Sequence, residues 1–86
     1  MKKAMIKGLK LLKTSENRVK ILKLLNQGKV RTPTEIADDT KIVINHVSNF
    51  LKEFKENNLV VCLNEEEKRG RLYQITENGK KLLELL

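Results

Sequence analysis

Hydrophobic residues recur at three- and four-residue steps along the first half of the chain, a pattern typical of amphipathic helices. Residues 1–13 show this pattern with lysines on the opposite face, which predicts a basic amphipathic helix. A second helix is expected over 15–27, because the hydroxyls at 14–15 can cap its start and Gly28 is a common stop signal. The residues alone leave open whether these two helices merge or kink at 14–15.

A capping box gives the clearest helix start in the sequence. Thr32 and Glu35 are spaced so that each side chain can bond a free backbone N–H, and Pro33 occupies the favoured first helical position. This predicts a short helix over 33–40. A longer helix is expected over 43–57, and a short helix followed by a tight turn and a longer helix is a helix-turn-helix pattern. The expected buried face of the longer helix consists of Val43, Val47, Phe50, Leu51 and Phe54.

The pattern changes after residue 58, where an apolar, β-branched segment at 59–63 predicts a strand. A second strand is expected over 71–75, and the polar segment between them makes 59–75 a hairpin. Thr76 then caps a last helix over 76–86. The sequence therefore predicts a single domain over 1–86, mainly α with a small β-hairpin, in the order helix-helix-helix-helix-hairpin-helix.

Charge is distributed unevenly along the chain, which has a formal net charge of +7. Residues 1–31 contain ten Lys or Arg and one acid, whereas residues 32–86 contain eight Lys or Arg and ten acids. A basic region of this kind favours nucleic acid or an anionic membrane surface as the partner. No apolar run approaches the ~18 residues of a membrane span, so we expect a cytoplasmic protein that does not enter a membrane.

The sequence offers no recognisable catalytic or metal-binding group. It has no paired carboxylates with a plausible pocket, no nucleophile beside a histidine and no phosphate loop. The single cysteine, Cys62, lies in an apolar strand and is expected to be a buried structural thiol. We therefore expect a protein that is not an enzyme and that needs no cofactor or metal. No small-molecule effector is expected, because the domain is small and has no obvious additional ligand-binding segment.

Five short segments, in the right order, resemble winged-helix regulators of the MarR and ArsR type. Residues 32–37 resemble the first helix of their helix-turn-helix, and 46–54 their recognition helix. The segments at 57–60, 69–71 and 75–79 resemble the exit into the wing, the wing tip and the start of the last helix. The resemblance covers roughly residues 15–86 and implies a winged helix-turn-helix domain.

The chain departs from that family at two places. Lys41 stands near a turn position often occupied by Gly, which implies either a different turn or a non-Gly residue in a strained conformation. Three glutamates at 65–67 lie in the expected wing beside Lys68, Arg69 and Arg71. Because acids repel phosphates, the wing is expected to meet DNA through its basic edge or not at all.

The resemblance implies a homodimeric transcriptional regulator, a repressor, that binds a palindromic site in double-stranded DNA. Asn side chains suit bidentate contacts to adenine, and Ser can donate or accept at any base. Phosphate contacts from basic side chains would set the register of the protein on the duplex. The expected base-reading residues are Asn45, His46, Ser48 and Asn49, and the expected phosphate-binding residues are Arg31, Thr32, Lys41, Lys52, Lys68, Arg69 and Arg71.

The terminal helices are expected to form the dimer contact, because a Leu-rich end would otherwise expose apolar surface. Residues 1–13 have two other interpretations, namely packing on their own domain or lying on a membrane as an amphipathic helix. Two other functions also remain open, a protein-interaction module and a non-specific chromosomal DNA-binding protein. The expected dimer-contact residues are Met5, Leu9, Leu12, Leu82, Leu83 and Leu86.

Overall fold

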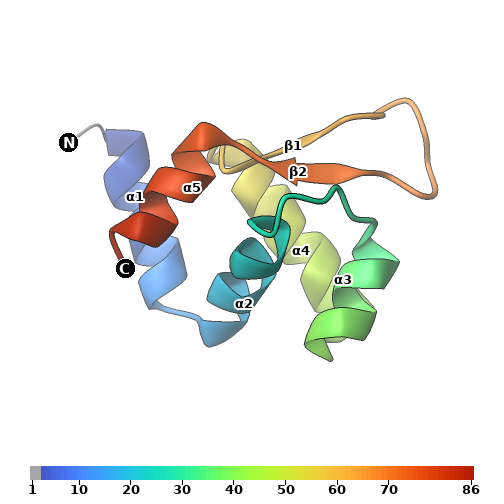
Figure 1. The fold of residues 1–86 in the computed structure, drawn as a ribbon, viewed down its shortest axis with the longest axis horizontal. Coiled ribbons are helices and arrows are strands. Elements are labelled where there is room, and N and C mark those ends of the chain that lie inside the picture. Colours follow the sequence, from blue (N-terminus) through green and yellow to red (C-terminus); the bar gives the residue numbers. More distant parts are fainter. Residues whose placement is uncertain (1–2) are drawn as a thin grey trace.

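The computed structural model describes residues 3–86, with side chains from residue 5 onward, so the first two residues of the predicted 1–13 helix lie outside it. Within this part, the helices are α1 (Lys3–Lys13), α2 (Glu16–Leu25), α3 (Pro33–Thr40), α4 (Ile44–Glu56) and α5 (Glu77–Glu84). The strands β1 (Val60–Cys62) and β2 (Tyr73–Ile75) lie between α4 and α5 (Figure 1). The predicted class, mainly α with a small hairpin, is confirmed.

Hydroxyl side chains cap three of these helices. The capping box is present: the Thr32 hydroxyl accepts a hydrogen bond from the Glu35 N–H at 3.2 Å, and the Glu35 carboxylate accepts one from the Thr32 N–H at 2.9 Å. These bonds lower the pKa of the Glu35 carboxyl, because they stabilise its charged form. Ser15 caps α2, so the chain breaks at 14–15 instead of continuing as one helix, and Thr76 caps α5.

The hydrophobic core lies where α2, α3 and α4 meet under the hairpin. Phe54, Leu51 and Val47 of α4 have no exposed side-chain surface, which holds this helix firmly against the rest of the chain. The predicted buried face of α4 is wrong at Val43, which is 61% exposed. Val43 precedes the first turn of α4 and therefore projects beyond the elements that cover the core.

The N-terminal helix α1 packs on its own chain, against α2 and α5. It lies at the end of the molecule away from the wing loop, which is the segment 63–72 between β1 and β2 (Figure 1). Leu12 of α1 and Leu82 of α5 are buried in the core at 1% and 0% exposure. Leu12 and Leu82 are therefore not available for the predicted dimer contact, because their side chains are buried within one chain. Residues 3–13 pack on their own domain, and the assignment of Met5, Leu9, Leu83 and Leu86 to a dimer contact stays a prediction. The side chains of Met5, Leu9 and Leu83 are half-buried against the same core.

The hairpin is shorter than predicted, because only three residues on each side pair as strands. Val60 lies opposite Ile75, and Cys62 lies opposite Tyr73. An unpredicted bridge joins Arg31 to Tyr73 through N–H to carbonyl distances of 3.1 and 2.9 Å. Arg31 stands in a polar segment without strand periodicity, so only the tertiary structure reveals this pairing. Cys62 is half-buried, which corrects its expected full burial.

The turn between α3 and α4 passes through Lys41 in the left-handed conformation, with φ of 63°. This conformation costs a non-Gly residue about 1–2 kcal/mol, so the strained alternative suggested by the sequence is the one adopted. We expect Lys41→Gly to raise the free energy of unfolding by about 0.5–1 kcal/mol, because the gain is partly offset by the greater freedom of Gly in the unfolded chain.

Urea denaturation measures this difference, and Lys41→Ala is the matched control. Alanine removes the same charge but retains the left-handed strain. An equal gain in both variants would assign the effect to the charge and contradict the role of the backbone.

Candidate nucleic-acid interface

Helix α4 turns a polar face to solvent on the side opposite its core residues. Asn45, Ser48 and Asn49 are exposed and lie on one face, because residues three and four apart are neighbours on a helix surface. His46 is also exposed but lies at the edge of this face, with its ring centroid 6.4 Å from that of Phe50. Three of the four predicted base-reading residues are therefore brought together, and His46 stands beside them.

A groove of about 500 Å³ separates α4 from the wing loop. Its walls carry Ser48, Asn49 and Lys52 from α4, and Lys68 and Arg71 from the loop. Predicted base-reading and phosphate-binding residues that are distant in sequence thus share one concave surface. Two further predicted phosphate-binding residues, Lys41 and Arg69, are exposed outside the lining of the groove.

Lys55 also lines the groove, and the sequence reasoning missed it. Its ammonium forms an ion pair with Glu65 of the wing loop. The hydrogen bond between them raises the pKa of Lys55 and lowers that of Glu65. The position of Lys55, three residues after Lys52 on α4, is the signal that would have placed it near this face. The ion pair joins the wing to α4 and neutralises part of the positive charge of the groove.

Two predicted phosphate-binding residues are used inside the fold. The Arg31 guanidinium lies 2.6 Å from the Asp39 carboxylate, also donates to Gln27, and has a side chain only 14% exposed. The Thr32 hydroxyl accepts the Glu35 N–H in the capping box. Both side chains therefore already have partners in their own domain.

Arg71 lines the groove but is also bound to its own loop. Its Nε donates to the Glu67 carbonyl at 2.6 Å, and its Nη2 donates to the Glu65 carbonyl at 3.2 Å. The side chain of Asn64 supports the same loop, accepting a hydrogen bond from the Leu72 N–H at 2.7 Å. Arg71 therefore shapes the wing loop and contributes its charge to the groove from a fixed position.

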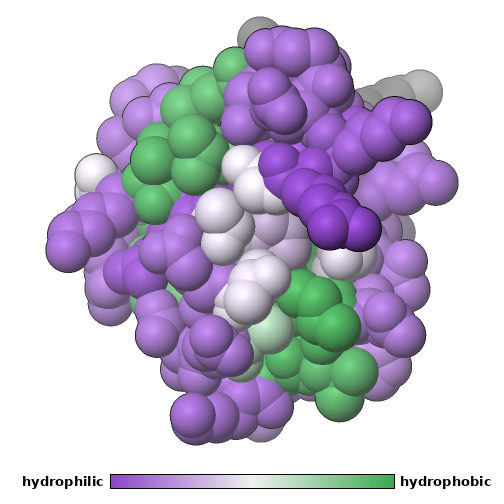
Figure 2. Space-filling model, turned by 90° about the vertical axis from the view of Figure 1, so that its right-hand side faces the viewer, coloured by the Kyte–Doolittle hydropathy of each residue, from purple (hydrophilic) through white to green (hydrophobic). Residues whose placement is uncertain are grey.

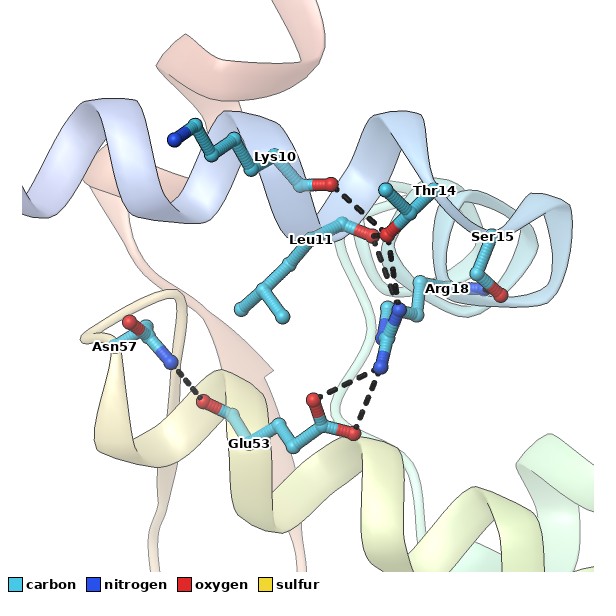
Figure 3. Close-up of polar contacts among 7 residues, drawn as sticks. All are labelled: Lys10, Leu11, Thr14, Ser15, Arg18, Glu53 and Asn57. Carbon is cyan, nitrogen blue, oxygen red and sulfur yellow. Dashed lines mark hydrogen bonds and ion pairs between the residues drawn. The ribbon is translucent and has the colours of Figure 1, made fainter.

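Arg18 of α2 fixes the orientation of α4 (Figure 3). Its guanidinium donates to both oxygens of the Glu53 carboxylate on α4, at 3.0 and 3.2 Å. It also donates to the Leu11 carbonyl and the Thr14 hydroxyl, and its carbon Cζ lies 5.2 Å from the centre of the Phe50 ring. A single nitrogen, Nη2, donates to both carboxylate oxygens, while Nη1 makes the bonds to Leu11 and Thr14, so one guanidinium joins α1, α2 and α4. The sequence reasoning missed Arg18, because its partner is 35 residues away and no local pattern indicates the contact.

No cluster of three His, Cys, Asp or Glu side chains that could hold a metal ion occurs among the residues that the structure describes. The helices in this same part of the chain are all too short or too polar to cross a membrane.

The order of α3, a tight turn, α4 and an antiparallel hairpin defines a winged helix-turn-helix, with α4 in the position of the recognition helix. The family model described as winged helix-turn-helix matches residues 15–86. The chain therefore belongs to the winged helix-turn-helix family, and the winged helix-turn-helix domain implied by the sequence motifs is confirmed.

Among solved structures, the crystal structure of a MarR family transcription regulator shares this fold, with a TM-score of 0.74 and 20% sequence identity. The match covers 94% of this chain and 54% of that one, so the chain spans about half the length of the regulator. No curated protein matches the sequence significantly.

Proposed function

We propose that this chain is a sequence-specific repressor that binds palindromic duplex DNA as a cytoplasmic homodimer. One observation carries the proposal: the exposed polar face of α4 opens directly onto the cationic groove between α4 and the wing. A major groove admits one α-helix and displays base edges that Asn and Ser can read. The phosphate backbone beside it is the anionic partner that a cationic groove attracts.

The proposed roles follow from position on α4. Asn45, Ser48 and Asn49 contact base edges, with His46 at the margin of the same contact. Lys41 precedes α4 and Lys52 follows the base-reading residues, so cations flank them on both sides. Lys41 and Lys52 therefore contact phosphates on either side of the major groove. The remaining proposed phosphate-binding residues are Lys68, Arg69 and Arg71 of the wing.

The dimer contact is proposed at the end of the molecule formed by α1 and α5. Ile6, Leu85 and Leu86 are 44%, 49% and 50% exposed there, next to the half-buried side chains of Met5, Leu9 and Leu83. Apolar surface of this kind favours association, and its place leaves α4 free. Two copies then present their α4 helices to successive major grooves about 34 Å apart, which makes the binding site a rough palindrome.

Selection of the purified chain on random duplex DNA over several rounds tests the proposal, with fluorescence anisotropy at moderate salt comparing selected and unselected pools. We expect enrichment of a palindromic site that binds much more tightly than the unselected pool. Selection without enrichment would contradict sequence-specific binding.

Replacing Asn49 by Ala is expected to relax the base preference at one position of each half-site. The loss of a bidentate contact costs about 1–3 kcal/mol of discrimination against the wrong base. Anisotropy titrations on the selected site and on single-base variants measure this discrimination. Asn78→Ala, an exposed Asn on α5, is the matched control and should leave the preference unchanged. Unchanged selectivity in Asn49→Ala would show that the reading face is assigned wrongly.

A protein-interaction module is the second candidate function, favoured by the acidic wing. Glu66 and Glu67 are exposed, and Glu65 forms an ion pair with Lys55, one of the cations that line the groove. A chain of this function binds no duplex DNA in the selection. Salt-sensitive binding without sequence preference would instead indicate a non-specific chromosomal protein, to which the basic first 31 residues are suited.

A further inference from the structure

The chain enters α4 through two exposed, β-branched apolar side chains. Val43 is 61% exposed and Ile44 is 41% exposed, whereas the preceding Ile42 is buried at 8%. Figure 2 shows hydrophobic patches within a mostly hydrophilic surface on the side that carries α3 and the wing loop. Exposed apolar groups gain free energy when a partner removes them from water, so this pair is a candidate contact surface.

The position of Val43 does not serve the stability of α4. Val43 is the N-cap residue and makes no side-chain hydrogen bond to the first turn. The corresponding residues of α2, α3 and α5 are Ser15, Thr32 and Thr76, and each accepts a backbone N–H there. A hydroxyl at position 43 would stabilise the helix in the same way. An apolar side chain at this place therefore has no evident role inside the fold.

The apolar pair continues the proposed base-reading surface. Ile44 lies one helical turn before Ser48 and directly before Asn45, and side chains of a helix lean toward its N-terminus. Ile44 thus projects from the end of α4 that a recognition helix directs at base edges. Lys41, two residues before Val43, is exposed. A cation therefore lies near the apolar pair, where it is able to bind a phosphate of the DNA backbone. A duplex that meets Asn45 and Lys41 also meets Ile44.

The major groove of DNA displays one apolar group, the C5-methyl of thymine. We infer that Val43 and Ile44 contact thymine methyl groups and so make A·T pairs part of the recognised sequence. This inference rests on the proposed DNA binding and names the chemical group that the start of α4 recognises. It agrees with the suitability of Asn45 and Asn49 for adenine, because each adenine pairs with a thymine.

Replacing single thymines of the selected site by deoxyuridine tests the inference, since only the methyl group is removed. At one or two thymines of each half-site, we expect the substitution to weaken binding of the unaltered protein by about fourfold, the change expected when the burial of one methyl group is lost. This measurement needs no protein variant and is independent of folding.

Protein variants then assign the methyl contact to residues. In Ile44→Ala or Val43→Ala, the same deoxyuridine substitution should have no further effect. Val61→Ala is the matched control, because Val61 on β1 is 43% exposed, close to the 41% of Ile44, and this variant should retain the fourfold effect. Thermal midpoints of all three variants verify that each is folded.

Three results would overturn the inference. Equal affinity for thymine and deoxyuridine at every position would show that no methyl group is read. Retention of the full deoxyuridine effect in Ile44→Ala and Val43→Ala would assign the methyl contact to other residues. Loss of dimerisation in these variants, without any deoxyuridine effect, would assign the pair to a protein contact. Failure of the proposed function is distinguishable, because the chain would then enrich no site at all.

Discussion

Replacing Gly79 by Ala is expected to lower the free energy of unfolding by about 3 kcal/mol, the upper part of the range for overpacking a core. An added Cβ would lie 2.5 Å from the Leu59 carbonyl oxygen and 2.7 Å from Cγ1 of Ile75. The Leu59 carbonyl accepts the Thr76 N–H at 3.0 Å, at the junction of the hairpin and α5. Since this neighbour is backbone, relief of the clash must move the hairpin or α5.

Thermal or urea unfolding measures this loss, which corresponds to a fall in melting temperature of roughly 15 °C for a domain of this size. Gly8→Ala is an informative comparison, because its Cβ would approach too closely only the side-chain end of Leu82, at 2.6 Å, and would lie at ordinary contact distances of 3.6 and 3.7 Å from Leu59. Leu82 is buried and must shift within the core, but a side-chain end moves at less cost than backbone, and Ala gains about 1 kcal/mol of helix propensity over Gly. The loss should therefore be smaller than in Gly79→Ala. Asn78→Ala, on the exposed surface, controls for the substitution in α5. Equal stability of Gly79→Ala and Asn78→Ala would contradict the close approach of α5 to the hairpin.

Replacing Lys52 by Glu is expected to weaken binding to the selected DNA site by about 30-fold per subunit. The reversal changes two charges beside a phosphate, and a charge pair near a solvated surface is worth about 1 kcal/mol or more. Lys52 lines the groove between α4 and the wing and is exposed. The loss should affect all sequences nearly equally, because a phosphate contact sets register and does not read bases.

Salt titrations separate this effect from a loss of folding. Loss of one phosphate contact should reduce the slope of log affinity against log salt by about 0.9 per subunit. Lys23→Glu, on the exposed surface of α2, makes the same charge change away from the groove and is the matched control. An equal loss in both variants would indicate a general charge effect and remove the groove from the DNA contact.

The order of the helices and the hairpin was predictable from the sequence because their start signals are local. The capping box of Thr32 and Glu35 acts within four residues, and α3 begins where that pattern places it. The strands were less predictable, because the ends of the hairpin depend on the side chains of Asn64 and Arg71 bonding the loop backbone. The strand propensities of the residues do not indicate where strand pairing ends and such a loop begins.

The candidate site was predictable in its residues on α4 and less so in its cations. Spacing alone places Asn45, Ser48 and Asn49 on one face. Arg31 and Lys52 have similar chemistry in the sequence, yet Arg31 pairs with Asp39 inside the fold whereas Lys52 faces the groove. Residue type indicates which groups are able to bind phosphate, but it does not indicate which are already bound to a neighbour.

Caps, helical periodicity and turn residues act over four or five positions, so the helices of this protein follow from its local sequence. How the helices and the hairpin meet depends on their packing. It buries Leu12 and Leu82 in one core, and it joins α2 to α4 through Arg18 and Glu53. The same packing leaves Val43 uncovered at the start of α4. These outcomes depend on contacts between residues far apart in the chain, and such contacts exist only once the helices have packed.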